Sequence, residues 1–204
     1  MPEERRSSGN MQLIQPKYES QGRLAAFTTG RFNRALASLL DRVSARQVFD
    51  AGCGEGLILT NLLRPRYTAL YGADLDSQRL EYARRQQPDL RLLQCNLEKI
   101  PLPADAVDLV LCLEVLEHVG NPQRCLAELH RVTRRYAILS VPNEPFWRLA
   151  NLARGAYWQH WGNTPEHINH WSVWGFRRFI KPLFNEVAVL NPVGVWTMLL
   201  AEKK

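Results

Sequence analysis

The segment DAGCGEGL, residues 50–57, constrains the fold of this chain more than any other stretch. A short apolar run ending at Asp50 precedes the glycines, and an apolar segment over 57–63 follows them and stops before Pro65. Glycines between a strand and a helix let the backbone turn sharply and approach a ligand closely, and the start of the helix offers free N–H groups. We therefore expect residues 50–57 to form a ligand-binding turn between a strand and a helix.

Strand and helix patterns alternate along the chain. Patterns typical of strands occur at 47–50, 69–74, 90–94, 107–113 and 136–141, and helical patterns at 31–43, 57–63, 77–87 and 121–130. Strands separated by helices in this rhythm indicate a parallel sheet with helices on both faces. Ser77, Asn121 and Ser172 each stand where a helix would begin, so we expect them to be N-caps. The final stretch, 186–204, indicates two strands.

Length and composition favour a single domain over residues 1–204, with 1–20 as a flexible tail. The chain has 204 residues, of which 46% are apolar and 23% charged, values ordinary for a globular protein. No apolar run could span a bilayer, and the amino-terminal segment lacks the apolar core of a signal peptide. The four cysteines form no C-x-x-C pair, which favours free thiols in a reducing compartment. We expect a cytoplasmic protein without integral membrane association.

The net charge of +6 is compatible with an anionic partner such as nucleic acid. The arginines are dispersed, however, and the densest groups hold only two or three basic residues. Solvated helix faces explain such groups better than a nucleic-acid footprint does.

An acid at the end of the second predicted strand indicates which ligand the turn binds. Gly52, Gly54 and Gly56 give G-x-G-x-G, which departs from the dinucleotide pattern G-x-G-x-x-G. Asp74 closes the strand over 69–74, where a carboxylate can accept hydrogen bonds from both hydroxyls of a ribose. The turn and the acid together predict a site for a cofactor that contains ribose.

Several ordered segments resemble class I S-adenosylmethionine-dependent methyltransferases. VFDAGCGEG resembles their first motif, YGADLD their ribose-binding strand end, and CNLEKIPLPADAVDLVLCLEVLEHV the adenine-binding turn with the fourth strand. The resemblance runs from about Val48 to Pro142 and is greatest to the small-molecule branch that includes the ubiquinone-biosynthesis O-methyltransferases, the type 11-like enzymes. It implies an α/β, Rossmann-like, doubly wound sheet of seven strands in the order 3-2-1-4-5-7-6, with strand seven antiparallel. It also implies S-adenosyl-L-methionine as cofactor and S-adenosyl-L-homocysteine as product.

The same resemblance implies roles for individual residues in cofactor binding. Gly52 and Gly54, with Asp50 beneath them, match the loop around the methionine part of the cofactor. Asp74 matches the acid that binds the ribose, and Leu75 matches the apolar residue beside the adenine.

Three further positions match residues near the adenine and the transferred methyl group. Asn96 stands where the family usually has an Asp that contacts the adenine amino group, and its side-chain oxygen can still accept that hydrogen bond. Leu97 would offer its backbone N–H, and Leu113 matches a residue whose backbone lies near the cofactor. Plain core packing is an equally open explanation for Leu75, Leu97 and Leu113.

Candidate catalytic residues are histidines, because methyl transfer needs alignment and exclusion of water, and a base helps when the acceptor is a hydroxyl. Glu114 and His118 are four residues apart and would share a face if this segment were helical. His118 is therefore a candidate base, and His167 and His170 are two more. The alternative for His118 is that it only shapes its loop.

The insertion over 143–171 is rich in aromatic side chains. Five of the six tryptophans lie between Trp147 and Trp174, and three of the five histidines between His160 and His170. In this fold the insertion sits over the carboxyl ends of the strands, so we expect an aromatic lid that forms the acceptor pocket. The tryptophans could also simply pack the insertion onto the sheet, and both can hold. No cysteine or carboxylate beyond Glu166 accompanies the histidines, so no metal is expected.

We expect methyl transfer from S-adenosylmethionine to a small-molecule or lipid-like acceptor by in-line displacement, as O- or N-methylation. One alternative is a nucleic-acid (tRNA) methyltransferase, but LCLEVLEH stands where amino-methylating DNA enzymes carry [DNS]-P-P-[YFW], and no RNA-binding domain is appended. The other alternative is a catalytically silent relative that binds the cofactor. The presence of Gly52, Gly54 and Asp74 argues against it. The acceptor atom and the oligomeric state stay open.

Overall fold

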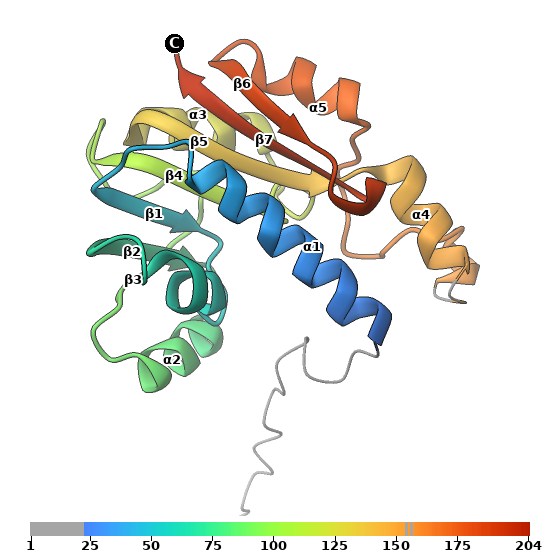
Figure 1. Ribbon diagram of the computed structural model, residues 1–204, viewed down its shortest axis with the longest axis horizontal. Helices are drawn as coiled ribbons and strands as arrows, with labels where there is room; N and C mark the ends of the chain where they lie inside the picture. Colours follow the sequence, from blue (N-terminus) through green and yellow to red (C-terminus); the bar gives the residue numbers. More distant parts are fainter. Residues whose placement is uncertain (1–22, 154, 156) are drawn as a thin grey trace, which may run out of the picture.

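A seven-stranded mixed sheet forms the centre of the computed structural model, which describes residues 23–153, 155 and 157–204. The strands are β1 (Gln47–Ala51), β2 (Ala69–Asp74), β3 (Arg91–Gln94), β4 (Val107–Leu113), β5 (Thr133–Pro142), β6 (Phe184–Leu190) and β7 (Trp196–Lys203). Their order is β3-β2-β1-β4-β5-β7-β6 (Figure 1). Strands β1 to β5 run parallel, and β7 is antiparallel to both β5 and β6. The predicted strand order and the antiparallel seventh strand are confirmed.

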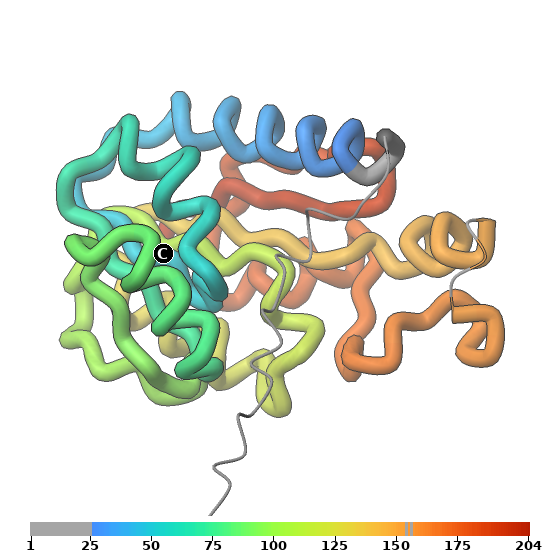
Figure 2. The backbone as a smooth tube through the Cα atoms, turned by 90° about the horizontal axis from the view of Figure 1, so that it is seen from below, coloured from blue at the N-terminus to red at the C-terminus, as the bar shows by residue number. Residues whose placement is uncertain are grey.

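Helices cover both faces of the sheet. They are α1 (Arg23–Leu40), α2 (Ser77–Gln86), α3 (Pro122–Val132), α4 (Glu144–Ala153) and α5 (Val173–Ile180), with short turns η1 (Leu59–Leu63), η2 (Trp158–His160) and η3 (Pro192–Gly194). Side chains of α1, η1 and α2 share one buried cluster, and those of α3 and α5 share the other. Figure 2 shows α1 along one side of the sheet and α4 beyond the carboxyl end of β5. Among the described residues, no helix combines the length and apolar character that crossing a membrane requires.

Strand β4 shows how the sequence pattern produces the two layers. Leu109 and Leu111 pack in the cluster with α1, whereas Val110 and Cys112 pack in the cluster with α3 and α5. All four side chains are fully buried. A continuous apolar run is the pattern of a parallel strand that is covered on both faces. The run over 107–113 predicted this strand with its correct ends.

Two of the three predicted helix caps are confirmed, and one is wrong. Asn121 accepts a hydrogen bond from the backbone N–H of Arg124, and Ser172 accepts one from Gly175. Ser77 is not the cap of α2, because Asp76 precedes it with extended backbone angles and its carboxylate accepts from Gln78 and Arg79. Aspartate caps as well as serine does, and its charge also suits the positive end of the helix.

Other boundaries shift by a few residues. The helix expected at 31–43 begins earlier, at Arg23, and ends at Leu40, and Val43 is buried in the turn that follows it. The helix expected at 57–63 contains a π-helical turn over Leu59–Leu63. The tail predicted over 1–20 lies outside the described residues.

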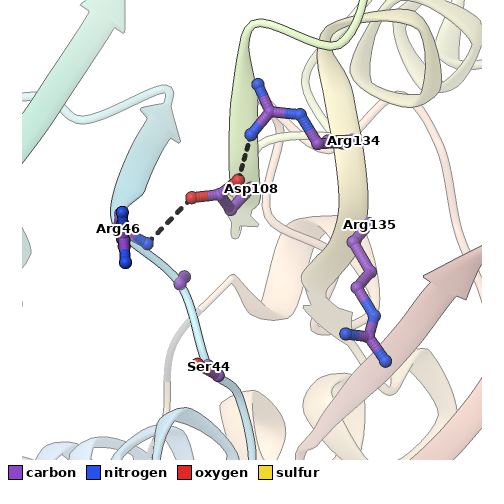
Figure 3. A pocket seen from close by; sticks show the side chains of 6 residues that line it. Ser44, Arg46, Asp108, Arg134 and Arg135 are labelled. Carbon is purple, nitrogen blue, oxygen red and sulfur yellow. Dashed lines mark hydrogen bonds and ion pairs between the residues drawn. The ribbon is translucent and has the colours of Figure 1, made fainter.

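The amino ends of the central strands are joined by Asp108. Its carboxylate accepts from the backbone N–H of Arg46 at 2.8 Å and of Gln47 at 3.0 Å, and it pairs with the Arg134 guanidinium (Figure 3). Burial alone would raise the pKa of Asp108, but these partners lower it. Arg46, Asp108 and Arg134 line a hollow of about 370 Å³ at the amino ends of the strands, whereas the glycine-rich turn lies at the carboxyl end of β1. We assign this end of the sheet a structural role.

Candidate cofactor and active site

The turn after β1, residues 52–56, is held against the end of β2. The backbone N–H groups of Gly52 and Cys53 both donate to the Ala73 carbonyl, at 2.7 and 2.8 Å. Gly52 has a φ of 86°, and a Cβ at this position would lie 2.3 Å from Cγ2 of Val115. Any larger residue would therefore push the turn away from the loop that follows β4, which explains the glycine.

Asp74 joins this turn to the start of α2. Its Oδ2 accepts from the Gly54 N–H at 2.8 Å, and its Oδ1 accepts from the Asp76 N–H at 2.9 Å. A carboxylate offers about four lone-pair sites, so each oxygen keeps the capacity to accept one more hydrogen bond. The side chain is only partly buried. Asp74 therefore fits the predicted binding of two ribose hydroxyls.

Asp50 lies beneath the turn as a buried acid. It is 3% exposed, and its Oδ2 has no hydrogen-bond partner among the described residues. Burial raises the pKa of Asp50 to about 7, and the neighbouring Asp74 carboxylate adds to the rise. A buried acceptor without a partner calls for an explanation such as a bound donor. The ammonium group of S-adenosylmethionine is such a donor, so the residues present fit the predicted cofactor.

The residues expected near the adenine lie on the next two loops. Leu75 directly follows Asp74 and is 67% exposed, which suits an apolar contact with a planar ring. Asn96 is exposed, and its Oδ1 accepts from the Glu98 N–H at 2.8 Å. Leu97 is buried in the core, and Leu113 is half-buried at the end of β4. Core packing therefore accounts for the Leu97 side chain, whereas the role of its backbone N–H stays a prediction.

The loop after β4, residues 114–119 and hereafter the β4 loop, is not helical, so Glu114 and His118 share no helix face. Glu114 has a φ of 58°, and its Oε1 accepts from the Ser140 hydroxyl at 2.8 Å. Burial raises the pKa of Glu114 to about 7, and the nearby Glu144 adds to it. Glu114 is thus held by β5, and the chain leaves β4 in a bend.

The structure brings two of the three candidate histidines into contact. The rings of His118 and His167 lie 5.0 Å apart, edge to face. Nδ1 of His118 lies 2.9 Å from the Glu166 carbonyl, and Nδ1 of His167 lies 3.1 Å from Oε1 of Glu144. His170 does not join this ring contact but reaches the same oxygen of Glu144, at 3.2 Å. Two of the predicted histidines, His167 and His170, therefore meet at one carboxylate that sequence reasoning missed.

That carboxylate, Glu144, starts α4 and is 6% exposed. Its Oε2 accepts from Nε of Arg148 at 3.0 Å. Burial alone would raise the pKa of Glu144, but the bonds from His167, His170 and Arg148 lower it to about 2. An acid two residues beyond the end of an apolar strand was its only signal in the sequence, and its histidine partners lie more than twenty residues further on.

Part of the 143–171 insertion is docked on the β4 loop. The Ile168 and Asn169 N–H groups donate to the Glu117 carbonyl at 2.9 and 3.0 Å. The Asn169 amide donates to the carbonyls of Leu116 and Val119, at 3.0 and 2.8 Å. These four bonds place His167 beside the end of β4.

The tryptophans of this region fall into two groups. Trp147 and Trp171 are partly buried, and Trp147 stacks on His167 with ring centroids 5.9 Å apart. Trp158, Trp161 and Trp174 are at least 66% exposed. Packing of the insertion therefore explains the first group, and the second group is exposed, with Arg178 over the Trp174 ring.

One group of side chains has the composition of a metal site. Glu117, His118 and His167 each offer a ligand atom within 4.8 Å of the other two. Glu117 is 1% exposed, and its Oε2 has no hydrogen-bond partner among the described residues. Burial raises the pKa of Glu117, with Glu114 and Glu144 adding, and a protonated carboxyl is a poor ligand. The expected absence of a metal stays a prediction, and His160 and His170 are not part of this group.

The stretch from β1 to β5 matches a known family. Residues 49–141 match the sequence profile of a methyltransferase domain. These residues form a methyltransferase domain. The predicted resemblance is thereby confirmed for this part of the chain, which contains the glycine turn, Asp74 and the β4 loop.

Two curated relatives of this methyltransferase domain indicate the breadth of the family. A probable S-adenosylmethionine-dependent methyltransferase of Mycobacterium tuberculosis is 35% identical over 107 residues, which are 52% of this chain and 39% of that protein. A ubiquinone biosynthesis O-methyltransferase of Rickettsia akari is 32% identical over 121 residues, 56% of this chain and 45% of that protein. The chain spans less than half the length of either relative.

Solved structures extend the likeness to the whole fold. A Pyrococcus horikoshii protein superposes with a TM-score of 0.74 at 14% sequence identity, covering 94% of this chain and 97% of that chain. At this identity the likeness concerns the fold alone. The methyltransferase domain thus has the class I, Rossmann-like architecture that the sequence predicted.

Proposed function

We propose that this chain binds S-adenosylmethionine at the carboxyl ends of β1 and β2 and methylates a small-molecule or lipid-like acceptor. The strongest support for this proposal is the hydrogen bond from the Gly54 N–H to the Asp74 carboxylate. It places an acid that can still accept further hydrogen bonds at the glycine turn. The switch between β1 and β4 in the strand order supports it, since open α/β sheets bind ligands at that point.

The residues of the turn have distinct tasks in this proposal. Asp74 accepts from the ribose hydroxyls, and Asp50 accepts from the ammonium group. Gly52 and Gly54 let the backbone approach the methionine part. Leu75 and Asn96 contact the adenine, with the backbones of Leu97 and Leu113 nearby. When bound, S-adenosylmethionine supplies an electrophilic methyl group on a sulfonium sulfur.

The insertion over 143–171 forms the part of the site that binds the methyl acceptor. Its bonds to the β4 loop hold the histidines over the end of β4, and exposed tryptophans offer apolar surface. Alignment of the two reactants and exclusion of water are the main contributions the chain can make to the transfer. A lid of this composition suits an aromatic or prenylated acceptor with a hydroxyl group, and the name of the Rickettsia akari relative points the same way.

The test is transfer of tritium from methyl-labelled S-adenosylmethionine to a prenylated phenol, to the matching phenol without its prenyl chain, and to bulk tRNA. We expect label in a phenol, and none with Asp74→Ala. The control is Asp89→Ala, which removes an exposed acid that pairs with Arg64. Asp89 precedes β3, so it lies at the amino ends of the strands, away from the cofactor turn. Label in tRNA alone would replace the small acceptor by a nucleic acid, and cofactor binding without any transfer would favour a silent relative.

A further inference from the structure

The Glu144 carboxylate connects three elements around His167. It begins α4, two residues beyond the end of β5, and it pairs with Arg148 one turn later. Its Oε1 lies 3.1 Å from Nδ1 of His167, which is 6% exposed at its side chain, and 3.2 Å from Nδ1 of His170. The Glu144 backbone N–H donates to the Trp171 carbonyl at 3.0 Å. The end of β5 and the docked part of the insertion are therefore joined at this residue.

The contact with Glu144 determines which nitrogen of His167 carries a proton. A carboxylate without a proton can only accept, so Nδ1 of His167 donates to it and the lone pair of the neutral ring is on Nε2. A carboxylate in this position orients the imidazole and stabilises the positive charge that forms when Nε2 takes a proton. Trp147, stacked on the same ring, limits its rotation.

His167 also contacts the β4 loop, which packs on the cofactor turn. Its ring contacts that of His118, and a nitrogen of His167 lies within 4.8 Å of the Glu117 carboxyl. Both neighbours belong to the β4 loop, whose Val115 packs against Gly52. His118, by contrast, is 39% exposed at its side chain, its Nδ1 lies 2.9 Å from the Glu166 carbonyl, and its Nε2 lies 4.0 Å from Oε1 of Glu117, whose pKa burial raises. Of the two rings, His167 has the shorter contact with a carboxylate, at 3.1 Å, and that carboxylate is the one whose pKa is lowered.

We propose that Glu144 is a positioning residue that holds His167 so that Nε2 accepts the proton of a hydroxyl acceptor. The inference rests on the proposed function. The acceptor O–H bond breaks as its proton passes to Nε2, and the oxygen forms the new bond to the methyl carbon. The C–S bond breaks, and its electron pair stays on sulfur. Glu144 stays ionised and balances the imidazolium.

The kinetic test compares Glu144→Gln, His167→Gln and the double variant, with Glu186→Gln as the matched control, because Glu186 is an exposed acid of β6 that pairs with Arg177. We expect kcat to fall on the order of 100-fold in each single variant, the size typical of general-base loss. We expect the dissociation constant of S-adenosylhomocysteine to stay within about twofold, and the double variant to be no slower than His167→Gln. Losses that multiply in the double variant, or an equal loss in Glu186→Gln, would overturn the proposal.

A second measurement needs no turnover. Long-range ¹H–¹⁵N correlation spectra should show His167 as the Nδ1–H tautomer in the wild type and as a mixture or the other tautomer in Glu144→Ala, which has no side-chain acceptor. The same tautomer in both proteins would refute the positioning role. If the wild type methylates nothing, the proposed function fails, and these spectra alone decide the role of Glu144. Turnover that EDTA abolishes and Zn²⁺ restores would make Nε2 a metal ligand and rule it out as the base.

Discussion

Gly52 and Gly54 both have a left-handed backbone, but their surroundings differ. The φ values are 86° and 53°. A Cβ at Gly52 would collide with Val115, whereas the nearest atom to one at Gly54 is Nη1 of Arg79 at 3.9 Å. Substituting each glycine in turn therefore separates the unfolding free energy lost to backbone strain from that lost to a steric clash.

We expect Gly52→Ala to lower the free energy of unfolding by about 2–4 kcal/mol, since strain and overpacking add. Gly54→Ala is the matched control and should cost about 1–2 kcal/mol, from strain alone. Urea unfolding followed by circular dichroism measures both. Equal losses in the two variants would contradict the close packing of the turn against the β4 loop.

Asp50 makes stability depend on pH. Its folded-state pKa is raised from 3.8 to about 7, so the folded protein holds one more proton than the unfolded chain between these values. Its contribution to the unfolding free energy therefore falls as pH rises through this window. Asp50→Asn lacks this titration and should be more stable than the wild type at pH 8, by on the order of 2–4 kcal/mol, with the difference vanishing near pH 4.

The measurement for Asp50→Asn is urea unfolding of both proteins at several pH values without cofactor. Glu114 and Glu117 titrate abnormally in both proteins, so the difference isolates Asp50. A gap that does not change with pH would contradict the assignment. The same substitution should weaken binding of S-adenosylhomocysteine, because an amide does not balance its ammonium charge.

At the residue scale, the sequence is most informative where the residues of a candidate site lie in short local patterns. Gly52, Gly54 and Asp74 could be singled out because a glycine-rich turn and an acid at a strand end are such patterns, and the structure brings Gly54 and Asp74 into contact. Glu144 was missed because its meaning depends on His167 and His170, which only the folded insertion brings to it.

At the scale of elements, the conformation of the β4 loop depends on its contacts with β5 and with the insertion. The sequence allowed a helix over 114–118, which would have put Glu114 and His118 on one face. Instead Ser140 holds Glu114 at positive φ, and Asn169 occupies the carbonyls of the loop. Strands 69–74 and 107–113 were predicted with their correct ends because their apolar patterns are local, whereas the loop depends on contacts with β5 and the insertion.

Asn169→Ala tests this docking. The substitution leaves the carbonyls of Leu116 and Val119 without their donor, so we expect the unfolding free energy to fall by about 1–3 kcal/mol. Amide exchange of residues 164–171 should become faster, and turnover should fall while cofactor affinity holds. The control is Asn185→Ala, at an exposed position of β6. Unchanged exchange over 164–171 would show that Asn169 does not anchor the insertion.

At the scale of the whole molecule, the sheet brings together residues that are far apart in the chain. Strands β1, β2 and β4 are parallel, so their carboxyl ends lie on the same side of the sheet. The glycine turn, Asp74 and the β4 loop therefore meet there. Strand rhythm predicted the parallel sheet, and the family resemblance supplied the order and the antiparallel β7. The path of the insertion could not be predicted, because its bonds to the β4 loop depend on single side chains such as Asn169 rather than on a periodic pattern.

Calorimetric titration of S-adenosylhomocysteine into the wild type and Asp74→Ala tests the central claim most directly. We expect micromolar binding to the wild type and a loss on the order of 100-fold in the variant, since two hydrogen bonds to a charged group are removed. Asp89→Ala should bind like the wild type, and circular dichroism should confirm that all three proteins are folded. Binding of near-wild-type strength to folded Asp74→Ala would contradict the placement of the ribose. No binding to the wild type would contradict the cofactor site itself.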